Sequence, residues 1–591
     1  MYGEGRPLLQ QPRNTRKEEF ACHSKCLCLP SKAAILIILW TAVIGTVYTI
    51  FVCTFVVGIS GVMHSKTSFV VYDSIPYSIL AVVMTFYPVS GFIADVCCGR
   101  FKVIIASLIC ITLSLILLCL TTLIGYLKQY GTGSLLIKQE GTLIVLVLVL
   151  FTTGLIGYQS NFIQLGLDQL LEAQSHYLAL FTHYAVWALS FTSAIITTTA
   201  TMISCISLRK AVAVFYGLTI PGLTTTLIIL LVISCWKHHW FSIQPGHNNP
   251  YRTVMRVLNF ARKHKYPLQR SAFTYSDDYI PTRIDFAKQR YGGPFSTEQV
   301  ENVKTFFRII SVLLTLGPIY VLQIPASSYV FPLFGLHTSN VTVEESPCSV
   351  NALLTLLVKV GCLKAAIPTI SFPIYIWFIF SVLNRKLPKI FTRLLLGIIL
   401  NLLGVISMLV IDVVGHSSNN VEATNITEPR CMFQVTRHNY RLEYQPINMH
   451  WSVLIPPSVF LGIGPLIITT TTLEFISAQS PHSMKGLLVG VSFAIEGFFQ
   501  LLGYSITLPL SLSRPWTRIG EAIHSTLSCG SVYFLFTCMV GLIGLVLFLV
   551  ASKRYKYRER DDENFSQRDV EEVYNRYLSQ RSSSSSDSYE D

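Results

Sequence analysis

Long runs of apolar residues, separated by polar segments, fill the chain between residues 33 and 551. The runs approach or exceed the roughly twenty residues that an α-helix needs to cross the hydrocarbon core of a bilayer. The pattern therefore predicts an all-α polytopic membrane protein with twelve transmembrane helices. The predicted spans are 33–60, 69–94, 101–125, 142–160, 176–204, 211–235, 306–331, 350–383, 391–413, 450–477, 486–510 and 528–551.

A long polar segment divides these spans into two sets of six. In secondary carriers, two such halves rock about a central site and expose it to each side of the membrane in turn. The closing tail contains a serine run from Ser582 to Ser586, which cannot build a core, and we expect it to be disordered. The predicted units are an N-terminal tail (1–32), a first half (33–235), a linker (236–305), a second half (306–551) and a C-terminal tail (552–591).

The distribution of charge gives the predicted orientation. Hydrophobic residues make up 51% of the chain and charged residues 13%, against about 25% charged residues in typical soluble proteins. The formal net charge is +13, and most Lys and Arg fall in the tails, the linker and alternate loops. Because cytoplasmic loops are enriched in Lys and Arg, both termini and the linker are predicted to be cytoplasmic. The basic excess thus follows the topology, and we predict a lipid bilayer and no nucleic acid as partner.

Two glycosylation sequons support this orientation. They begin at Asn340 and Asn425, in segments predicted to face the outside, whereas a third at Asn564 lies in the inner tail and should stay unmodified. Cys348 and Cys431 lie in two different outer loops. The outer side of a membrane is oxidising, so a disulfide between these two cysteines is predicted.

The N-terminal tail contains a short sorting pattern. Glu4 is followed by Leu8 and Leu9 in the spacing Glu-x-x-x-Leu-Leu. Clathrin adaptors read such acidic dileucine signals in exposed cytoplasmic tails and route membrane proteins to endosomes and lysosomes. The pattern leaves two locations open, the endolysosomal membrane and the plasma membrane.

Three local motifs stand at the ends of predicted helices. The first runs from Gly91 to Asp95 and continues with Gly99 and Arg100, between the second and third spans. The second, Asn161 to Leu170, follows the fourth span. The third joins the tenth and eleventh spans and reads Glu-Phe-Ile-Ser-Ala-Gln-Ser-Pro-His-Ser-Met-Lys from Glu474. The polar and small residues that we single out in the second and third motifs are Asn161, Gly166, Asp168, Gln169, Gln479 and Pro481.

These motifs resemble the proton-dependent oligopeptide transporter (POT) family of the major facilitator superfamily, whose signature reads Glu-Phe-x-Tyr-x-Gln-Ala-Pro-x-Ser-Met-Lys. The resemblance implies a major facilitator fold and a secondary carrier for small peptides, amino acids or related organic solutes, coupled in the family to protons. It implies that Gly91, Asp95, Gly99 and Arg100 form a latch between the halves. The family counterpart of Glu474 contacts the amino end of a bound peptide.

The chain departs from the family at the proton-coupling positions. The family's first helix usually carries Glu-x-x-Glu-Arg, whereas from Ala33 to Ser65 this chain has no acidic or basic residue except His64. No Asp or Glu occurs between Glu301 and Glu344, where the peptide carriers usually have an aspartate. Three functions therefore stay open: a carrier with or without proton coupling, a non-transporting sensor or scaffold with this fold, and a uniporter for a different, anionic solute.

Charged residues inside membrane spans are costly and mark functional sites. Glu496 shares a helical face with Ser492 and Gln500, which makes a polar stripe along the eleventh span. Lys359 and Lys364 lie on two faces of the eighth span, and Lys359 is also placed to snorkel to the membrane surface. The predicted substrate-binding residues are Glu474, Glu496, Lys359 and Lys364. The sequence contains no catalytic constellation, phosphate loop or zinc spacing, so we expect neither enzymatic activity nor a metal or other cofactor.

Overall fold

The protein is an all-α bundle. The computed structural model describes residues 29, 31–62, 78–129, 137–170, 175–206, 219–242, 250–264, 266, 281–325, 362–377, 388–419, 436–438, 441–443, 449–481, 484–512 and 529–555. Two short antiparallel strands, β1 (Thr436–His438) and β2 (Arg441–Glu443), accompany the helices. Ten of the described helices are long and apolar enough to cross a membrane, and residues 220–236 and 363–376 form two shorter apolar helices.

The first half contains the helices from the N-terminal side of the linker. A helix that begins at residue 78 breaks at Thr85 and Phe86 and continues as α4, and a π-turn, η1, extends α4 to residue 98. Gly99 has a φ of 79°, a conformation that only glycine adopts readily, and it allows the chain to turn directly into the next helix. The elements are α2 (Lys32–Val62), α4 (Tyr87–Ile93), η1 (Ala94–Cys98), α5 (Arg100–Gln129), α6 (Ile137–Asp168), α7 (Ser175–Ile206) and α9 (Ile220–Trp236).

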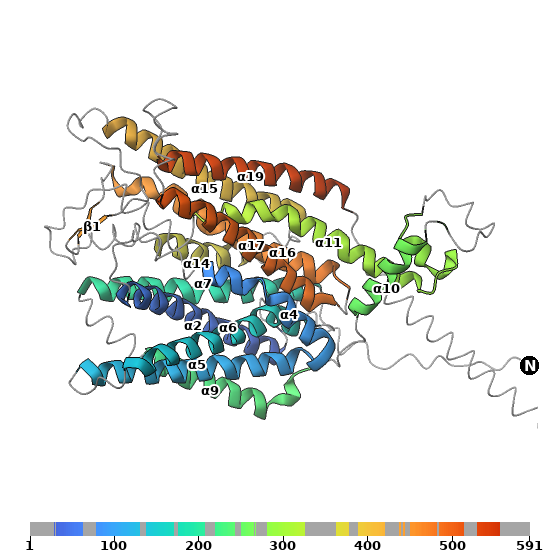
Figure 1. The fold of residues 1–591 in the computed structure, drawn as a ribbon, viewed down its shortest axis with the longest axis horizontal. Helices are drawn as coiled ribbons and strands as arrows, with labels where there is room; N and C mark the ends of the chain where they lie inside the picture. Colours follow the sequence, from blue (N-terminus) through green and yellow to red (C-terminus); the bar gives the residue numbers. More distant parts are fainter. Residues whose placement is uncertain are drawn as a thin grey trace, which may run out of the picture.

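The second half contains the remaining long helices. They are α11 (Thr297–Val321), α14 (Cys362–Trp377), α15 (Ile390–Asn419), α16 (Ile455–Gln479), α17 (Lys485–Leu512) and α19 (Cys529–Arg554), and the short turn η8 (Trp451–Leu454) leads into α16. In Figure 1 the blue and teal helices of the first half lie together below the yellow-green to red helices of the second half. Within the halves α5 packs along α6, α2 along α7, and α15 along α16.

The linker lies beyond one end of the bundle. It contains α10 (Pro250–Lys263) and the turns η5 (Asp285–Ala287) and η6 (Gln289–Tyr291), and Figure 1 shows α10 beside the start of α11. We call this end of the bundle the linker end. Asp285 is fully buried and accepts hydrogen bonds from Thr282, Lys288 and Lys304, which ties the linker to α11.

Among the helix boundaries that differ from the hydropathy pattern, two affect the motifs and the linker. The fourth helix does not end near residue 160 but continues as α6 to Asp168, so the second motif lies within a helix. Neighbouring helices supply partners for some of its polar side chains, such as Ser90 for the Asn161 amide. Helix α11 begins at Thr297, inside the range assigned to the linker, where Ser296 and Gln299 form a capping box.

Candidate functional site

A cavity lies between the two halves. Its volume is about 460 Å³, which falls within the range of about 300–1,000 Å³ that is usual for small-molecule sites. The first half contributes α2, the helix that precedes α4, α4 itself, α6 and α7. The second half contributes the turn directly after α11, together with α14, α16 and α17. Because both halves line the cavity, any movement of one half against the other reshapes it.

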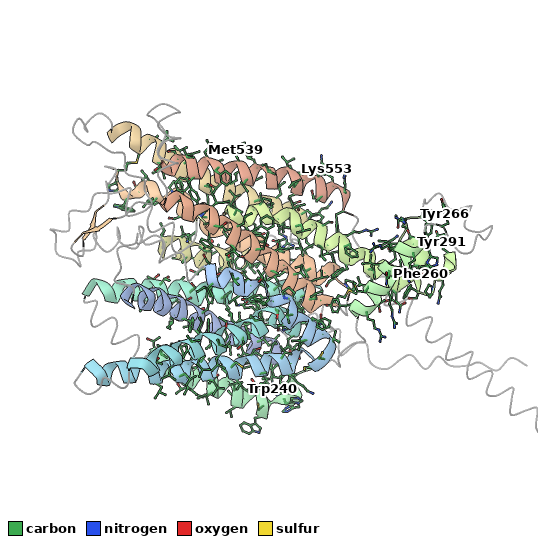
Figure 2. The ribbon with its side chains drawn as sticks, in the orientation of Figure 1. Trp240, Phe260, Tyr266, Tyr291, Met539 and Lys553 are labelled. Carbon is green, nitrogen blue, oxygen red and sulfur yellow. The ribbon has the colours of Figure 1, made fainter. Side chains whose placement is uncertain are left out.

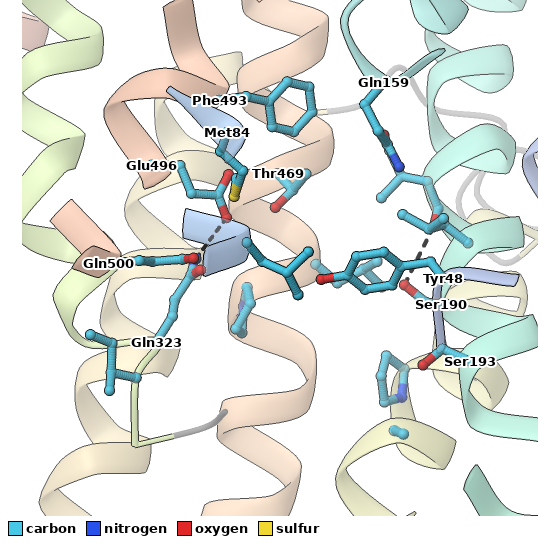
Figure 3. A pocket seen from close by; sticks show the side chains of 18 of the residues that line it. Tyr48, Met84, Gln159, Ser190, Ser193, Gln323, Thr469, Phe493, Glu496 and Gln500 are labelled. Atoms are coloured by element: carbon cyan, nitrogen blue, oxygen red, sulfur yellow. Dashed lines mark hydrogen bonds between the residues drawn. The ribbon is translucent and has the colours of Figure 1, made fainter. Parts of the chain in front are cut away.

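One wall of the cavity carries a carboxylate and amides. Glu496 on α17 accepts a hydrogen bond of 3.2 Å from the Gln500 side chain one turn further along the helix, and Gln323 also lines this wall. Figure 3 shows Glu496, Gln500 and Gln323 gathered on one side, with Met84 and Phe493 beside them. The structure thus places Glu496 and Gln500 together at the cavity, on the polar stripe that the sequence predicts.

The opposite wall is polar but uncharged. Tyr48 from α2 and Ser190 and Ser193 from α7 face the cavity across from Glu496 (Figure 3). Lys364 on α14 lines the cavity as well. Among the described residues that line it, Lys364 and Glu496 are the two with charged side chains. The site therefore offers one positive and one negative group, both on the second half, against hydroxyl and amide groups on the first.

Glu474 lies elsewhere in the bundle, in an ion pair. Arg393 at the start of α15 donates two hydrogen bonds of 2.7 Å to the two oxygens of the Glu474 carboxylate. The Arg393 side chain is 6% exposed and the Glu474 side chain 15%. Glu474 is not among the described residues that line the cavity. Its carboxylate is held by a planar, bidentate partner, and substrate binding by Glu474 stays a prediction.

The two halves also meet beside this ion pair. The indole Nε1 of Trp187 on α7 donates a hydrogen bond of 3.0 Å to the Thr369 carbonyl on α14. One turn earlier on α7, His183 stacks on Phe372 of α14 at 5.5 Å. These contacts join α7 to α14 beside the cavity, which Val186 on α7 and Pro368 on α14 line.

The first motif joins the halves at the linker end. Arg100 donates to Asp95 at 2.9 and 3.1 Å and to Asp168 at 2.6 Å, and all three side chains are buried. The second oxygen of Asp95 accepts the Leu487 N–H at 3.1 Å, in the first turn of α17. A carboxylate is favoured there by the helix dipole and by the N–H groups that have no partner within the helix.

Glycines allow α4 and α17 to approach closely at this end. A Cβ on Gly91 would collide with the Gly486 carbonyl, and a Cβ on Gly490 would lie 2.7 Å from the Tyr87 carbonyl oxygen. Further along α17, a Cβ on Gly497 would lie 2.6 Å from the Ala81 carbonyl oxygen. Side chains at these positions would push the helices apart, so the glycines permit the contact that places Leu487 against Asp95.

The other motif residues hold neighbouring segments together. The Asn161 amide donates to Ser90 on α4 and to the Gly157 carbonyl on its own helix. Gly166 leaves room for the Phe181 ring on α7. Gln169 exchanges two hydrogen bonds with the Ser242 backbone. Gln479 accepts a hydrogen bond from the Tyr555 hydroxyl, and Pro481 is buried directly after α16.

Several predicted residues lie outside the part of the chain that the structure describes. They are the candidate substrate residue Lys359, the sequon residues Asn340 and Asn425, the cysteines Cys348 and Cys431, and the sorting residues Glu4, Leu8 and Leu9. These assignments remain predictions from the sequence.

Comparison with known proteins decides the family. The sequence profile of the POT family (PTR2) matches residues 101–513, which is more than half of the chain. The chain belongs to the POT family. This confirms the resemblance that the three motifs indicated. As a member of this family the protein is a multi-pass membrane transporter of small peptides or related solutes and not an enzyme.

The relatives of this POT protein include animal and plant transporters. Solute carrier family 15 member 3 of Rattus norvegicus is 23% identical over 518 residues, which cover 81% of this chain and 84% of the relative. The protein of the same name from Mus musculus is also 23% identical, over 80% of this chain and 83% of the mouse protein. Protein NRT1/PTR family 6.3 of Arabidopsis thaliana is 28% identical over 131 residues, or 21% of each chain.

Two solved structures share the fold. The crystal structure of an auto-inhibited POT family peptide transporter superposes with a TM-score of 0.56 at 16% identity, over 89% of this chain and 98% of the other. The transporter PepTSo superposes with a TM-score of 0.54 at 15% identity, over 88% of this chain and 97% of that one. The all-helical POT-type transporter fold of this chain is thereby confirmed.

Some site residues gave no signal in the sequence. Arg393 reads as one more positive charge beside a predicted span, and its partner Glu474 is separated from it by 81 positions. Tyr48 and Gln159 line the cavity from the first half, yet uncharged polar residues are common in transmembrane helices. Asp168 was singled out only as a motif residue, and its pairing with Arg100 follows from the packing of α5 against α6.

Proposed function

We propose that the protein is a secondary carrier that moves a small organic solute by alternating access around the cavity that contains Glu496 and Lys364. The observation that carries this proposal is that the cavity is lined by residues of both halves. A site at such an interface is exposed to one side of the membrane or the other as the halves rock.

The contacts at the linker end, together with the contact between α7 and α14 beside the cavity, act as the gate on that side of the cavity. Asp95 binds the start of α17, the glycines let α4 and α17 touch, and Trp187 binds α14. All three contacts cross from one half to the other. These three contacts must break together for the solute to leave toward the linker end, and their polar groups must then be hydrated. Taking the linker end as cytoplasmic, as the positive-inside rule predicts, this arrangement is closed to the cytoplasm.

The chemistry of the cavity favours a solute with an amine and a carboxylate. Lys364 supplies a cation for a carboxylate, and Glu496 supplies an anion for an amine. Apolar residues around them, such as Leu466 and Phe493, suit the aliphatic part of a small peptide or amino acid. A site that offers one group of each sign selects against solutes with two groups of the same sign, because one charge would lack a partner.

Proton coupling, if the carrier uses it, depends on Glu496. The acidic positions of the first and seventh helices are absent from the sequence, and Glu474 is engaged by Arg393. Glu496 is then the carboxylate in contact with the cavity that is placed to gain or lose a proton as the cavity opens. The uniporter and the non-transporting sensor remain outcomes of the experiment below.

The test is uptake by the purified full-length protein in proteoliposomes. A labelled dipeptide is supplied with and without an inward proton gradient, to the parent, Glu496→Gln and Lys364→Gln. Lys553→Gln is the matched control, because Lys553 is exposed on α19 and far in sequence from any residue that lines the cavity. We expect parent-level uptake in the control. Uptake by Lys364→Gln should be at least about ten-fold lower, because the carboxylate of the solute would lack a cationic partner in the cavity, which costs more than about 1.4 kcal/mol.

The pH response separates the remaining functions. Proton coupling predicts gradient-stimulated uptake in the parent and loss of the stimulation in Glu496→Gln. A uniporter predicts uptake that ignores the gradient in every variant. Absence of uptake of dipeptides, amino acids and organic anions by a correctly folded parent contradicts the carrier function and favours the sensor or scaffold.

A further inference from the structure

A cluster of basic and aromatic side chains lies where α9 ends. Lys237 lies over the ring of Trp236 at 4.8 Å and over that of Trp240 at 5.7 Å, and Lys32 at the start of α2 lies over the Trp240 ring at 5.6 Å. His238 is exposed beside them. We call Lys32, Trp236, Lys237, His238 and Trp240 the interfacial cluster. None of these residues lines the cavity between the halves.

Buried aromatic rings pack the backbone beneath the cluster against two neighbouring helices. Phe241, which follows Trp240, is buried and stacks on Trp40 of α2 at 5.6 Å. The ring of Phe101 on α5 packs against both Phe241 and His238, at 4.8 and 5.2 Å. Three helices, α2, α5 and α9, thus fix the positions from which the two lysines project, so little conformational entropy is lost when the cluster binds a ligand.

The cluster faces the lipid rather than the protein interior. Ile229, Val232 and Trp236 follow one another at helical spacing along α9 and are 57%, 58% and 76% exposed. An exposed apolar stripe on a membrane-spanning helix contacts acyl chains, and tryptophan at its end marks the headgroup level. Figure 2 shows Trp240 at the outer edge of the bundle, beyond the end of α9. The lysines therefore lie at the depth of the phosphate groups.

Among the described residues, the lysines of the cluster have no acidic partner. Within the described part of the chain neither Lys32 nor Lys237 forms an ion pair, whereas Arg100 nearby is paired with two aspartates. The tryptophan rings hold the ammonium groups by cation–π contact but accept no N–H hydrogen bond in their ring plane. Each ammonium group can therefore donate N–H hydrogen bonds to an anion in the membrane.

We propose that the interfacial cluster is a binding site for the headgroup of an anionic phospholipid in the leaflet at the linker end. The two lysines contact the phosphate and the acidic headgroup, and Trp236 and Trp240 lie against the glycerol and the upper acyl chains. A lipid bound there contacts α2 and α9 together, at the edge of the first half.

Native mass spectrometry of the full-length protein tests the site. The protein is released from detergent micelles after incubation with equimolar phosphatidylserine and phosphatidylcholine, and bound lipids are counted. We expect the parent to retain phosphatidylserine in preference to phosphatidylcholine. Each lysine near an anionic headgroup contributes a factor of about five in affinity, so Lys32→Gln/Lys237→Gln should lower phosphatidylserine binding by about 25-fold.

Two variants control for charge and folding. Arg262→Gln/Lys263→Gln removes two exposed charges from α10 at the same end of the bundle and should bind phosphatidylserine as the parent does. Lys237→Arg keeps the charge and the cation–π contact, and should retain the preference.

Four results would overturn the proposal. In the first, the parent binds both lipids equally. In the second, the double-lysine variant keeps the preference for phosphatidylserine, and in the third, the α10 variant loses as much phosphatidylserine binding as the double-lysine variant. In the fourth, inorganic phosphate at millimolar concentration displaces the lipid. The first makes the cluster an ordinary interfacial anchor, and the last makes the ligand a soluble phosphate.

Discussion

Asp95 accepts the Leu487 N–H at 3.1 Å and thereby joins the two halves of the bundle at the linker end. The same carboxylate pairs with Arg100, whose guanidinium also binds Asp168. One buried side chain thus takes part in the packing within the first half and in the contact between the halves. When the halves separate, Arg100 keeps Asp168 as a partner, so the open state does not leave its charge unpaired.

Asp95→Asn should loosen the linker end without unfolding the protein. The amide oxygen can still accept the Leu487 N–H, but the amide NH2 then faces the Arg100 guanidinium and cannot accept from it. The charge that favours the start of α17 is also lost, and charged hydrogen bonds are worth about 1.5–3 kcal/mol. Hydrogen–deuterium exchange of peptides covering residues 484–490 should accelerate. Asp285→Asn removes a buried carboxylate that does not contact α17 and should leave that exchange unchanged. Equal protection in parent and Asp95→Asn would contradict the gate role of this contact.

The Arg393–Glu474 ion pair should behave as a coupled unit. Removal of one member of a buried pair costs about 3–5 kcal/mol, because the other charge stays buried without a partner. Arg393→Gln and Glu474→Gln should each lower the midpoint of thermal unfolding in detergent, and the double variant should be less destabilised than the sum of the two. Additive losses would mean that the pair is not coupled. If the Glu474→Gln variant keeps the unfolding midpoint of the parent but loses affinity for amine-bearing solutes, Glu474 is assigned to substrate binding.

The linker should be insensitive to moderate acidity. Burial by itself raises the pKa of Asp285, but hydrogen bonds from Lys288, Lys304 and Thr282 outweigh it and hold the pKa below its ordinary value of 3.8. A lowered carboxyl pKa contributes stability above the unfolded value, and that contribution is lost only as the pH falls through the folded value. Tryptic cleavage of the linker, normalised at each pH to cleavage of an unfolded reference substrate by the same trypsin, should therefore be equally slow at pH 7 and pH 5 in the parent. It should be faster at both values in Asp285→Asn, and a parent linker that opens by pH 5 would refute this assignment.

The predicted orientation has its own test. If the segments that contain Asn340 and Asn425 face the outside, glycosidase treatment of protein from mammalian cells should increase gel mobility. Asn340→Gln/Asn425→Gln should abolish the shift, and Asn564→Gln should leave it unchanged. A shift that depends on Asn564 would reverse the assignment of the termini to the cytoplasm.

Residues that are close along one helix were predictable from the sequence. Glu496 and Gln500 are four positions apart, so helical periodicity alone places them on one face. The structure has the Gln500 amide donating to the Glu496 carboxylate at the cavity. Hydropathy likewise indicated the helices, because each span must cover the width of the bilayer.

Residues that are brought together by packing between helices were not predictable. Arg393 and Glu474 meet only because α15 packs along α16, and Asp95 meets Leu487 only because the glycines bring α4 against α17. A polar helix end such as Asn161 to Asp168 reads as a loop until its partners on neighbouring helices are known. Local pattern contains no information about these distant partners.

The distance between the halves at the linker end tests the central claim most directly. Spin labels attached through unnatural amino acids at the exposed residues Lys102 on α5 and Lys553 on α19 report this separation and leave the native cysteines in place. Alternating access predicts two distance populations in double electron–electron resonance, a shorter one with the gate closed and a longer one with it open. Addition of a transported dipeptide should shift their ratio. Gly490→Leu, which places a side chain against the Tyr87 backbone, should favour the longer distance. A single distance that neither the solute nor Gly490→Leu changes would contradict alternating access in this protein.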